Sequence, residues 1–597
     1  MKRYVAVWLK LLRLTWQLFP GQTAALLVLR LLMVGVTAAT ALAMRAVVNA
    51  VAEGDPAGAV RASAVTALTL GLNAYALGAE HNVLFLLVER VGLKHVRAQI
   101  DRDIAGLEGL DHLERTDFLD RVTVVRGAAW GLTYGMWNAV DTIFAALRLV
   151  VMLVLLGVVN PWLLLLLAFA AAPLWFERRG RKAIVQAELD TAERMRLQRH
   201  LFELATEART NKEIRTAGVG PALARRQEQI WQEMAEVWLR ARVRSGAWRF
   251  AGWSLFTLGF AGGMGLVAAD AAGGAGSVGD VVLAIMVAVT MRESVETTVS
   301  RTATVADAGR LIEPYLWLQE YVAADRGRAK DDRAAPDRLR DGITFDHVSF
   351  TYPGRDEPAL DDVSVHLPAG TVVALVGEYG SGKTTLVKLL LKFYRPDEGT
   401  IRVDGVDLAA IDTEQWRRNV SAAFQDFGRF HTVFAETIGL GDLEHLTDTK
   451  RIEAAIRSAD AEELVRRLPD GLDTELGREQ GGVDLSEGQW QKTALARASM
   501  RERPLLFVLD EPTASLDAPS EHAVFAGYMA RARGLADRAG AIVVVVSHRF
   551  STVTGADLIL VLANGRLAET GTHEELLALD GRYAELYNIQ ATAYART

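Results

Sequence analysis

Six long apolar stretches in the first 322 residues constrain the fold of this chain more than any other feature. They cover roughly residues 22–51, 60–90, 131–159, 161–177, 246–269 and 278–298. A helix that crosses a lipid bilayer needs about 20 mostly apolar residues, and each stretch is close to this length or longer. The sequence therefore predicts an all-α transmembrane domain with six spanning helices.

The segments around these stretches indicate an orientation in the membrane. Residues 2–19 mix apolar residues with Lys and Arg, which is typical of an interfacial helix and not of a cleavable signal peptide. Long connections at 91–130 and 178–245 begin with clusters of basic residues, whereas the other connections are short. The positive-inside rule then places the long connections and both termini in the cytoplasm, with the chain in the cytoplasmic membrane.

Several ionisable residues interrupt the apolar stretches: Glu80, His81, Asp141, Arg148, Arg292, Glu293 and Glu296. A charge that faces lipid is costly, so each side chain is expected to face a water-filled cavity or a partner. Three interpretations are open: a substrate pathway, pairing between helices, or a span that ends before the charged residue.

The chain changes character after residue 322. Residues 323–338 are charged and contain no large apolar residue, which is typical of a linker. Residues 339–597 have the pattern of a soluble α/β domain. The net charge of -7 gives no reason to expect a nucleic-acid partner. The absence of cysteine excludes disulfides, thiolate metal sites and a cysteine nucleophile.

A phosphate-binding loop lies near the start of this α/β region. The β-branched run at 371–376 predicts a buried strand, and residues 386–393 have a helical pattern. The loop between them has the spacing G-x-x-x-x-G-K-T and contains Gly377, Glu378, Tyr379, Gly380, Ser381, Gly382, Lys383, Thr384 and Thr385. Its glycines let backbone N–H groups point at the β- and γ-phosphates, Lys383 neutralises their charge, and the Thr384 hydroxyl can bind Mg²⁺.

Two further predicted strands, 505–509 and 541–546, end in polar residues. After the first, Asp510 is placed to hold Mg²⁺ through water, and Glu511 is a candidate general base. After the second, His548 would reach the γ-phosphate. Ligands of open α/β sheets bind outside the carboxyl ends of the strands, so the three motifs predict one nucleotide-hydrolysing site.

Residues 485–497, Leu-Ser-Glu-Gly-Gln-Trp-Gln-Lys-Thr-Ala-Leu-Ala-Arg, lie between these motifs and resemble the signature sequence of ATP-binding cassette (ABC) transporters. The order of the motifs, and six spans ahead of one cassette, resemble the exporter type over nearly the whole chain. The resemblance implies an α/β P-loop nucleotide-binding domain with a helical subdomain. It also implies ATP and Mg²⁺ as cofactors and a second half-transporter as partner.

The resemblance gives roles to further residues. Tyr352 corresponds to the aromatic residue that stacks on adenine, and Gln425 to a glutamine that contacts Mg²⁺ at the membrane-domain interface. Ser515 and Asp517 lie in the loop that crosses the dimer. The residues that act on the ATP of the partner are Ser486, Glu487, Gly488 and Gln489. Short cytoplasmic helices near 113–121 and 211–216 are expected to transmit cassette closure to the spans.

Glu487 departs from the family, whose signature has glycine at this position. A carboxylate that points at the γ-phosphate would repel it. In one interpretation the side chain points away and the chain forms a homodimer, which we favour because helix N-termini tolerate acidic side chains. In the other, the chain pairs with a different subunit and contributes to a weakened ATP site.

The predicted function is ATP-driven export of an amphipathic compound, either a peptide, a lipid or a drug-like molecule. The segment 424–427 and Trp490 look like the branch that includes bacterial peptide exporters. One alternative is import of a metal-carrier complex. Another is an ATP-gated channel or regulatory subunit, but the presence of both Glu511 and His548 favours a pump.

Overall fold

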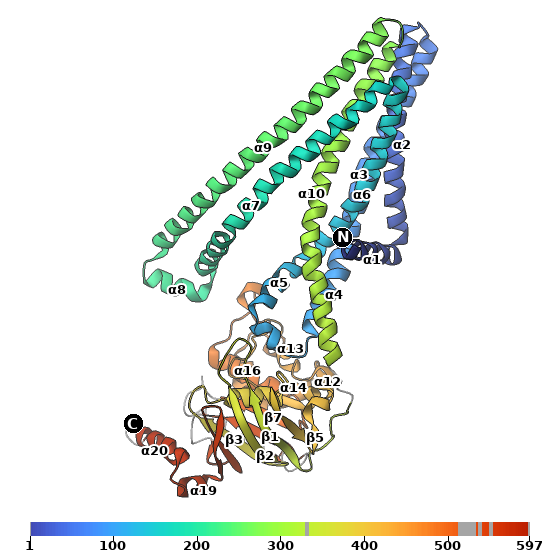
Figure 1. Cartoon of the computed structure of the whole chain (residues 1–597). Helices are drawn as coiled ribbons and strands as arrows, with labels where there is room; N and C mark the ends of the chain where they lie inside the picture. The colour runs from blue at the N-terminus through green and yellow to red at the C-terminus, as the bar shows by residue number, and fades with distance from the viewer. Residues whose placement is uncertain (1, 329–332, 512–532, 535–539, 548–552, 595–597) are drawn as a thin grey trace. The chain divides into compact units, whose positions relative to one another are not determined.

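The computed structural model describes residues 2–328, 333–511, 533–534, 540–547 and 553–594 (Figure 1). Contacts divide the chain into two compact units. We call residues 1–102 and 122–318 the membrane unit, and residues 103–121 and 319–597 the cassette unit. The segment 103–121 therefore belongs with the C-terminal part of the chain, although it lies far from it in sequence.

The membrane unit is helical throughout its described part (Figure 1). Its long helices are α2 (Pro20–Ala52), α3 (Pro56–Leu87), α6 (Ala128–Val159), α7 (Leu166–Thr206), α9 (Gly220–Ala272) and α10 (Val278–Arg328). The shorter elements are α1 (Lys2–Leu18), η1 (Val88–Arg97), α4 (Ala98–Ala105), η3 (Pro161–Leu165) and α8 (Ala208–Thr216). The predicted interfacial helix corresponds to α1, and α10 continues into the segment that the sequence suggested as a linker.

Five helical segments are long and apolar enough to cross a membrane: Pro20–Ala52, Pro56–Ala105, Ala128–Val159, Pro161–Thr206 and Gly220–Ala272. The predicted sixth span at 278–298 lies in α10 but does not reach this level in the described residues, because charged side chains interrupt it. These side chains are Asp280, Arg292, Glu293 and Glu296.

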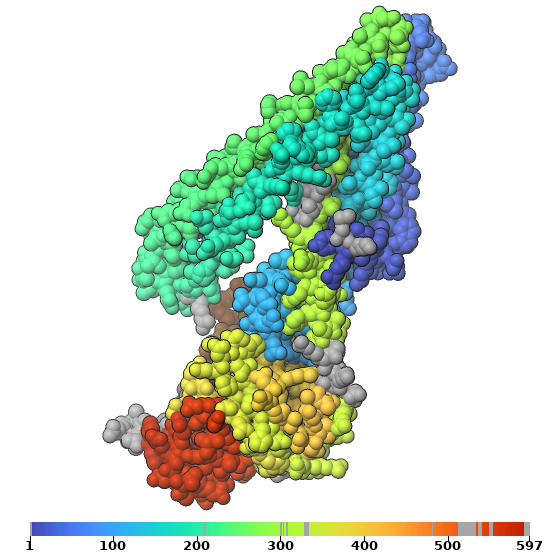
Figure 2. Space-filling model, in the orientation of Figure 1, coloured from blue at the N-terminus to red at the C-terminus, as the bar shows by residue number. Residues whose placement is uncertain are grey.

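Helices α7 and α9 run side by side (Figure 1; Figure 2), and glycines lie where they meet. A Cβ atom at Gly259 would lie 2.4 Å from the Phe169 ring, and one at Gly180 would lie 2.9 Å from the Ser245 hydroxyl. Small residues allow the backbones of two membrane helices to approach closely. We call these contacts, with that of Gly252, the glycine seam.

The cassette unit contains two sheets. The first is antiparallel, with the order β2 (Leu360–Pro368), β1 (Gly342–Phe350), β4 (Glu398–Val403) and β5 (Val406–Asp407). The second has the order β10 (Arg566–Gly571), β9 (Leu558–Ala563), β3 (Val372–Gly377), β8 (Ile542–Val546), β7 (Leu506–Asp510) and β6 (Val420–Ala423). All neighbours in the second sheet are parallel except β10 and β9.

Alternate residues of the parallel strands enter two different cores. Leu506 and Val508 of β7 pack with residues of the first sheet, whereas Phe507 and Leu509 pack with the helical subdomain that includes Trp490. This alternation follows from the period of two along a strand. Because both faces of the parallel sheet are covered, polar groups meet at its edge, where the strands end.

The helices of the cassette unit surround these sheets. They are η2 (Asp111–Glu114), η4 (Leu408–Ala410), α11 (Lys383–Leu390), α12 (Thr413–Arg418), α13 (Phe434–Gly439), η5 (Leu443–His445), α14 (Thr449–Ser458), α15 (Glu462–Arg467), η6 (Gly471–Asp473), η7 (Arg478–Gln480), α16 (Glu487–Ala498), α19 (His573–Ala578) and α20 (Arg582–Tyr594). Helix α5 (Thr116–Arg126) runs from one unit into the other, as do α4 and α10. The predicted fold class, a helical membrane domain followed by an α/β domain, is confirmed.

Candidate functional site

Several of the predicted nucleotide-site residues meet at one edge of the parallel sheet. Val546 of β8 pairs with Leu375 of β3 on one side and with Asp510 of β7 on the other. The loop after β3 and the residue Glu511 after β7 therefore leave the sheet at the same edge. Gln425 follows β6 at this edge too, since β6 is parallel to β7.

The loop between β3 and α11 has a backbone that requires glycine. Gly377 has φ +150°, and a Cβ atom there would lie 2.3 Å from the Leu562 carbonyl oxygen. Gly382 has φ +102° and directly precedes α11. Only glycine adopts such angles at little cost, which explains the two positions. The N-terminus of the eight-residue helix α11 adds a partial positive charge at the loop.

The Lys383 ammonium is held inside this loop. Its Nζ atom donates hydrogen bonds to the carbonyl oxygens of Gly377 at 3.0 Å and Glu378 at 2.8 Å. Burial lowers the pKa of Lys383, opposed by the charges of Glu511 and Asp510. A cation fixed at the centre of a glycine-rich turn is suited to binding the phosphates of a nucleotide.

Two carboxylates stand at the end of β7. Asp510 is buried, and burial, together with the charges of Glu511 and Asp426, raises the pKa of Asp510 to about 6. Glu511 has φ +48°, an uncommon angle for a residue with a side chain, and its N–H donates to the Val546 carbonyl oxygen at 3.0 Å. Carboxylates that repel one another in a buried site favour a divalent cation, so this pair fits Mg²⁺.

Other predicted residues lie around this edge or outside the described residues. The Tyr352 hydroxyl is 3.1 Å from the Thr385 hydroxyl, and the Lys388 ammonium lies 5.1 Å from the centre of the Tyr352 ring. The predicted adenine contact of Tyr352 stays a prediction. His548, Ser515 and Asp517 lie outside the described residues.

The signature residues begin helix α16. Ser486 and Gln489 form a capping box, in which the Ser486 hydroxyl accepts from the Gln489 N–H and the Gln489 side chain accepts from the Ser486 N–H. The Glu487 carboxylate forms an ion pair with Arg429, with an Nη2–Oε2 distance of 2.5 Å. Both side chains are about half exposed, at 45% for Arg429 and 56% for Glu487. Glu487 is thus directed toward a cation of its own chain.

Within the cassette unit, a short segment before α5 contacts residues 393, 394 and 417. We call residues 108–114 the docking loop. Its Leu110 N–H donates to the Phe393 carbonyl oxygen at 3.0 Å, and Arg417 donates to the Glu108 carbonyl oxygen at 2.6 Å. Tyr394 donates a hydrogen bond to the Glu114 carboxylate, and burial raises the pKa of Tyr394.

The docking loop is connected to the nucleotide edge through aromatic rings. The Phe393 ring lies 6.0 Å from that of Phe424, the residue before Gln425. The Tyr394 ring lies 5.3 Å from that of Tyr352. The segment predicted near 113–121 as a transmitting helix therefore overlaps this loop, whereas the residues that hold it escaped the sequence analysis. The sequence around Arg417 and Tyr394 does not predict these contacts, because their partners are about 300 residues away in the chain.

Five of the predicted ionisable residues in the membrane unit line one cavity of about 340 Å³: Glu80, Asp141, Arg148, Glu293 and Glu296. His81 lines a different hollow, and the Arg292 guanidinium lies 5.6 Å from the centre of the Trp253 ring. The sequence analysis overlooked Arg30, although a lone arginine within an apolar stretch is itself a signal.

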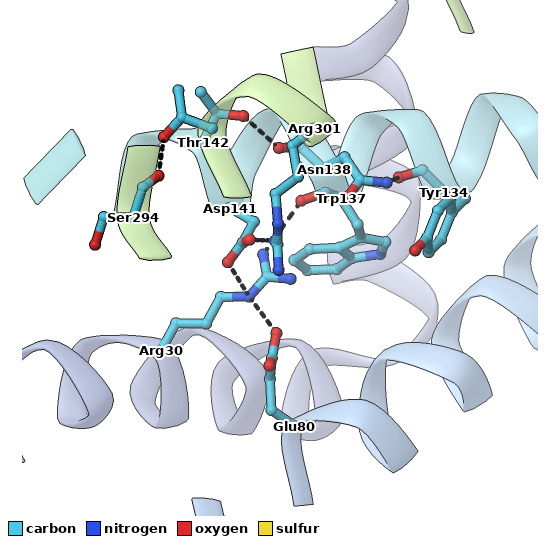
Figure 3. A network of polar contacts seen from close by, with 10 residues as sticks. Arg30, Glu80, Tyr134, Trp137, Asn138, Asp141, Thr142, Ser294 and Arg301 are labelled. Atoms are coloured by element: carbon cyan, nitrogen blue, oxygen red, sulfur yellow. Dashed lines mark hydrogen bonds and ion pairs between the residues drawn. The ribbon is translucent and has the colours of Figure 1, made fainter. Parts of the chain in front are cut away.

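Figure 3 shows a cluster of charged residues in the lining of this cavity, which includes Arg30, Glu80 and Asp141. The Arg30 guanidinium lies between Glu80, at 3.1 Å, and Asp141, at 3.4 Å. Arg301 of α10 forms a second ion pair with Asp141. The cluster joins α2, α3, α6 and α10. Its ion pairs give the charged side chains of these helices partners within the protein, because a charge that faces lipid is costly.

One sequence family and several curated proteins match part of the chain. The sequence family described as "ABC transporter" matches residues 360–514. Proteins named "ATP-dependent lipid A-core flippase" are 40% identical over 254 residues in Sodalis glossinidius (strain morsitans) and 42% identical over 273 residues in Dechloromonas aromatica (strain RCB). These matches cover 42% and 46% of this chain, and 42% and 44% of the relatives, so the chain spans less than half the length of each.

A solved structure matches nearly the whole chain. It is described as "Structure of a bacterial Atm1-family ABC exporter with ATP bound". The two chains are 25% identical, with a TM-score of 0.76, and the match covers 96% of this chain and 99% of the other.

Proposed function

Since this multi-pass membrane chain has the architecture of an exporter-type ABC half-transporter with an ATP-binding domain, we propose that it hydrolyses ATP to export an amphipathic substrate. The observation that carries the proposal is the meeting of the phosphate loop, Asp510 and Glu511 at one sheet edge. The chain acts in the cytoplasmic membrane, with both termini and the cassette unit in the cytoplasm. The names of the curated relatives make a lipid one candidate cargo.

The residues at the sheet edge divide the chemistry between them. The loop N–H groups and Lys383 bind the phosphates, while Thr384, Gln425 and Asp510 would hold Mg²⁺. Bound Mg²⁺ supplies charge neutralisation at the β- and γ-phosphates. Glu511 orients the attacking water and accepts its proton. His548 is assigned to the γ-phosphate from its place after β8, by sequence alone.

The partner is a second half-transporter, and we propose a homodimer. In a closed dimer, residues 486–489 of one chain act on the ATP of the other. Glu487 does not exclude this arrangement, because Arg429 offsets its charge within the same chain. An unpaired carboxylate at that position would repel the γ-phosphate of the partner's ATP.

Replacement of Arg429 by Ala is expected to raise the KM for ATP by about three- to tenfold, because Glu487 loses its counter-charge. Steady-state ATP hydrolysis by the purified protein in lipid measures this. The double variant Arg429→Ala, Glu487→Gly should recover most of the lost affinity. If the double variant is as impaired as the single one, Arg429 does not act through Glu487.

The docking loop provides a route from hydrolysis to transport. It contacts Phe393 and Tyr394, whose rings approach Phe424 and Tyr352. A change at Gln425 when ATP is bound or hydrolysed would therefore displace the surface on which the loop rests. Arg417 holds this surface, since it also donates to the carbonyl oxygens of Leu391 and Lys392.

Wild-type protein in inside-out vesicles is expected to accumulate a fluorescent amphipathic dye when Mg²⁺ and ATP are added. Arg417→Ala should reduce this transport by about tenfold while leaving ATP hydrolysis within about threefold of wild type, because a partly buried, charged hydrogen-bond donor is lost. The matched control is Arg418→Ala, whose exposed partner is Glu414. ATP hydrolysis without ATP-dependent accumulation of dye or of any zwitterionic, cationic or anionic amphiphile by wild type would contradict the export proposal.

A further inference from the structure

The charged cavity of the membrane unit has features that helix pairing does not explain. It is lined by charged residues and also by an apolar wall that includes Met33, Val34, Leu77 and Phe144. A cavity that served only to satisfy buried charges would need no such wall. Charged groups beside apolar surface are typical of a site for an amphipathic ligand.

Arg30 supplies the first ligand-directed group. Its side chain is only 2% exposed, and it uses Nε and Nη1 to bind Glu80, Asp141 and the Trp137 carbonyl oxygen. Its Nη2 atom is buried and has no hydrogen-bond partner. Since a buried donor without an acceptor is costly, Nη2 is available for an anionic group of a ligand.

Arg148 supplies a second donor on the same cavity. Its Nε atom is also buried without a hydrogen-bond partner. The Glu293 carboxylate of α10 attracts the Arg148 guanidinium electrostatically. Two guanidinium groups with open donors thus face the same space as one anion-binding pair.

Two further residues of the cavity lining are acidic. Glu293 and Glu296 lie on α10 three positions apart, which places them on one face of the helix. Neither is buried, and both line the cavity. Two adjacent carboxylates of like charge are stabilised by a cation between them.

We propose that this cavity binds a zwitterionic amphiphile. The anionic group of the ligand accepts from Arg30 and Arg148, its amine is held by Glu293 and Glu296, and its apolar part lies on Met33, Val34 and Phe144. This inference rests on the proposed export function, because it names the class of substrate that the pump moves. The chemistry is that of a phospholipid headgroup with phosphate and amine, or of a short apolar peptide with free termini.

The presence of both kinds of charge in the lining favours a ligand that carries both. Three guanidinium groups, those of Arg30, Arg148 and Arg301, share the cavity with the carboxylates of Glu80, Asp141, Glu293 and Glu296. A purely anionic headgroup would meet more carboxylates than guanidinium groups. A purely cationic one would leave the donors of Arg30 and Arg148 unmatched. A ligand that carries both charges can pair with the guanidinium groups and with the carboxylates of the cavity.

The test measures binding to the nucleotide-free full chain in a neutral maltoside detergent. Three amphiphiles with the same dodecyl tail are compared: dodecylphosphocholine, dodecyl phosphate and dodecylamine. We expect dodecylphosphocholine to bind about tenfold more tightly than either singly charged compound. A tetrapeptide of apolar residues with free termini and its end-capped form distinguish a peptide source from a lipid source.

Charge-neutral variants then test which residues bind each charged group of the ligand. Glu293→Gln with Glu296→Gln should shift the preference toward dodecyl phosphate, and Arg148→Gln should shift it toward dodecylamine, each by about tenfold. The matched control is Glu313→Gln, which removes an exposed carboxylate from α10 away from the cavity. Arg30 and Asp141 are left intact, because their burial makes a folding defect the expected result.

Equal binding of the three amphiphiles, or equal shifts in the control, would overturn the zwitterion site. Selective binding of the peptide or of the lipid supports it and identifies the source. ATP hydrolysis is measured separately on the same preparations. If the protein binds zwitterions but does not hydrolyse ATP, the proposed export function is wrong, whereas the proposed binding site is supported.

Discussion

Glu511→Gln is expected to leave ATP affinity unchanged and to slow hydrolysis by about 100-fold or more, which is the range for loss of a general base. The glutamine keeps the size of the side chain and the backbone hydrogen bond from Glu511 to Val546. It cannot accept a proton from the attacking water. Single-turnover hydrolysis and equilibrium binding of a fluorescent ATP analogue separate the two effects.

The matched control for this variant is Glu502→Gln. Glu502 is an exposed carboxylate of the cassette unit, with Arg451 as a distant ion-pair partner at 3.7 Å. Its replacement is expected to alter neither binding nor turnover. If Glu511→Gln hydrolyses ATP at more than about a tenth of the wild-type rate, the assignment of Glu511 as general base is wrong.

Lys383→Ala is expected to weaken ATP binding by about 100-fold, since it removes a charge-assisted donor at the centre of the phosphate loop. Isothermal titration with MgATP measures the change. The ammonium also ties the loop together through the carbonyl oxygens of Gly377 and Glu378. Lys383→Arg keeps the charge but not the fit, and should therefore recover only part of the affinity.

A comparison with Lys450→Ala controls for loss of positive charge in the cassette unit, because Lys450 is exposed on α14. ATP binding within about threefold of wild type in Lys383→Ala would mean that phosphates are bound elsewhere. Together, Lys383→Ala and Glu511→Gln separate nucleotide capture from hydrolysis. Their effects are expected to fall on different measurements.

The sequence predicted those parts of the site that adjoin a strand. Gly377, Asp510 and Glu511 each follow a short run of buried apolar residues, and parallel strands bring their carboxyl ends to one edge. The spacing G-x-x-x-x-G-K-T of the loop also predicts that it binds phosphate. Local pattern was sufficient here because each side chain is positioned by its own strand.

Contacts between distant segments were beyond the sequence. Arg429 lies 58 positions before Glu487, and nothing in either segment predicts their ion pair. The cluster around Arg30 depends on how four helices are rotated about their axes, which apolar stretches do not specify. The ion pair with Arg429 gives a physical reason for the hypothesis that Glu487 points away from the nucleotide.

The close contacts of the glycine seam are expected to make α7 and α9 move as one body. At about 1.5 Å per residue, the 53 residues of α9 extend for about 80 Å, while the hydrocarbon core of a bilayer takes up only about 30 Å. Because a methyl group at Gly180 or Gly259 would already meet the neighbouring helix, α7 and α9 are expected to tilt together. A tilt of the pair by about 5° would displace the far end of α9 by about 7 Å.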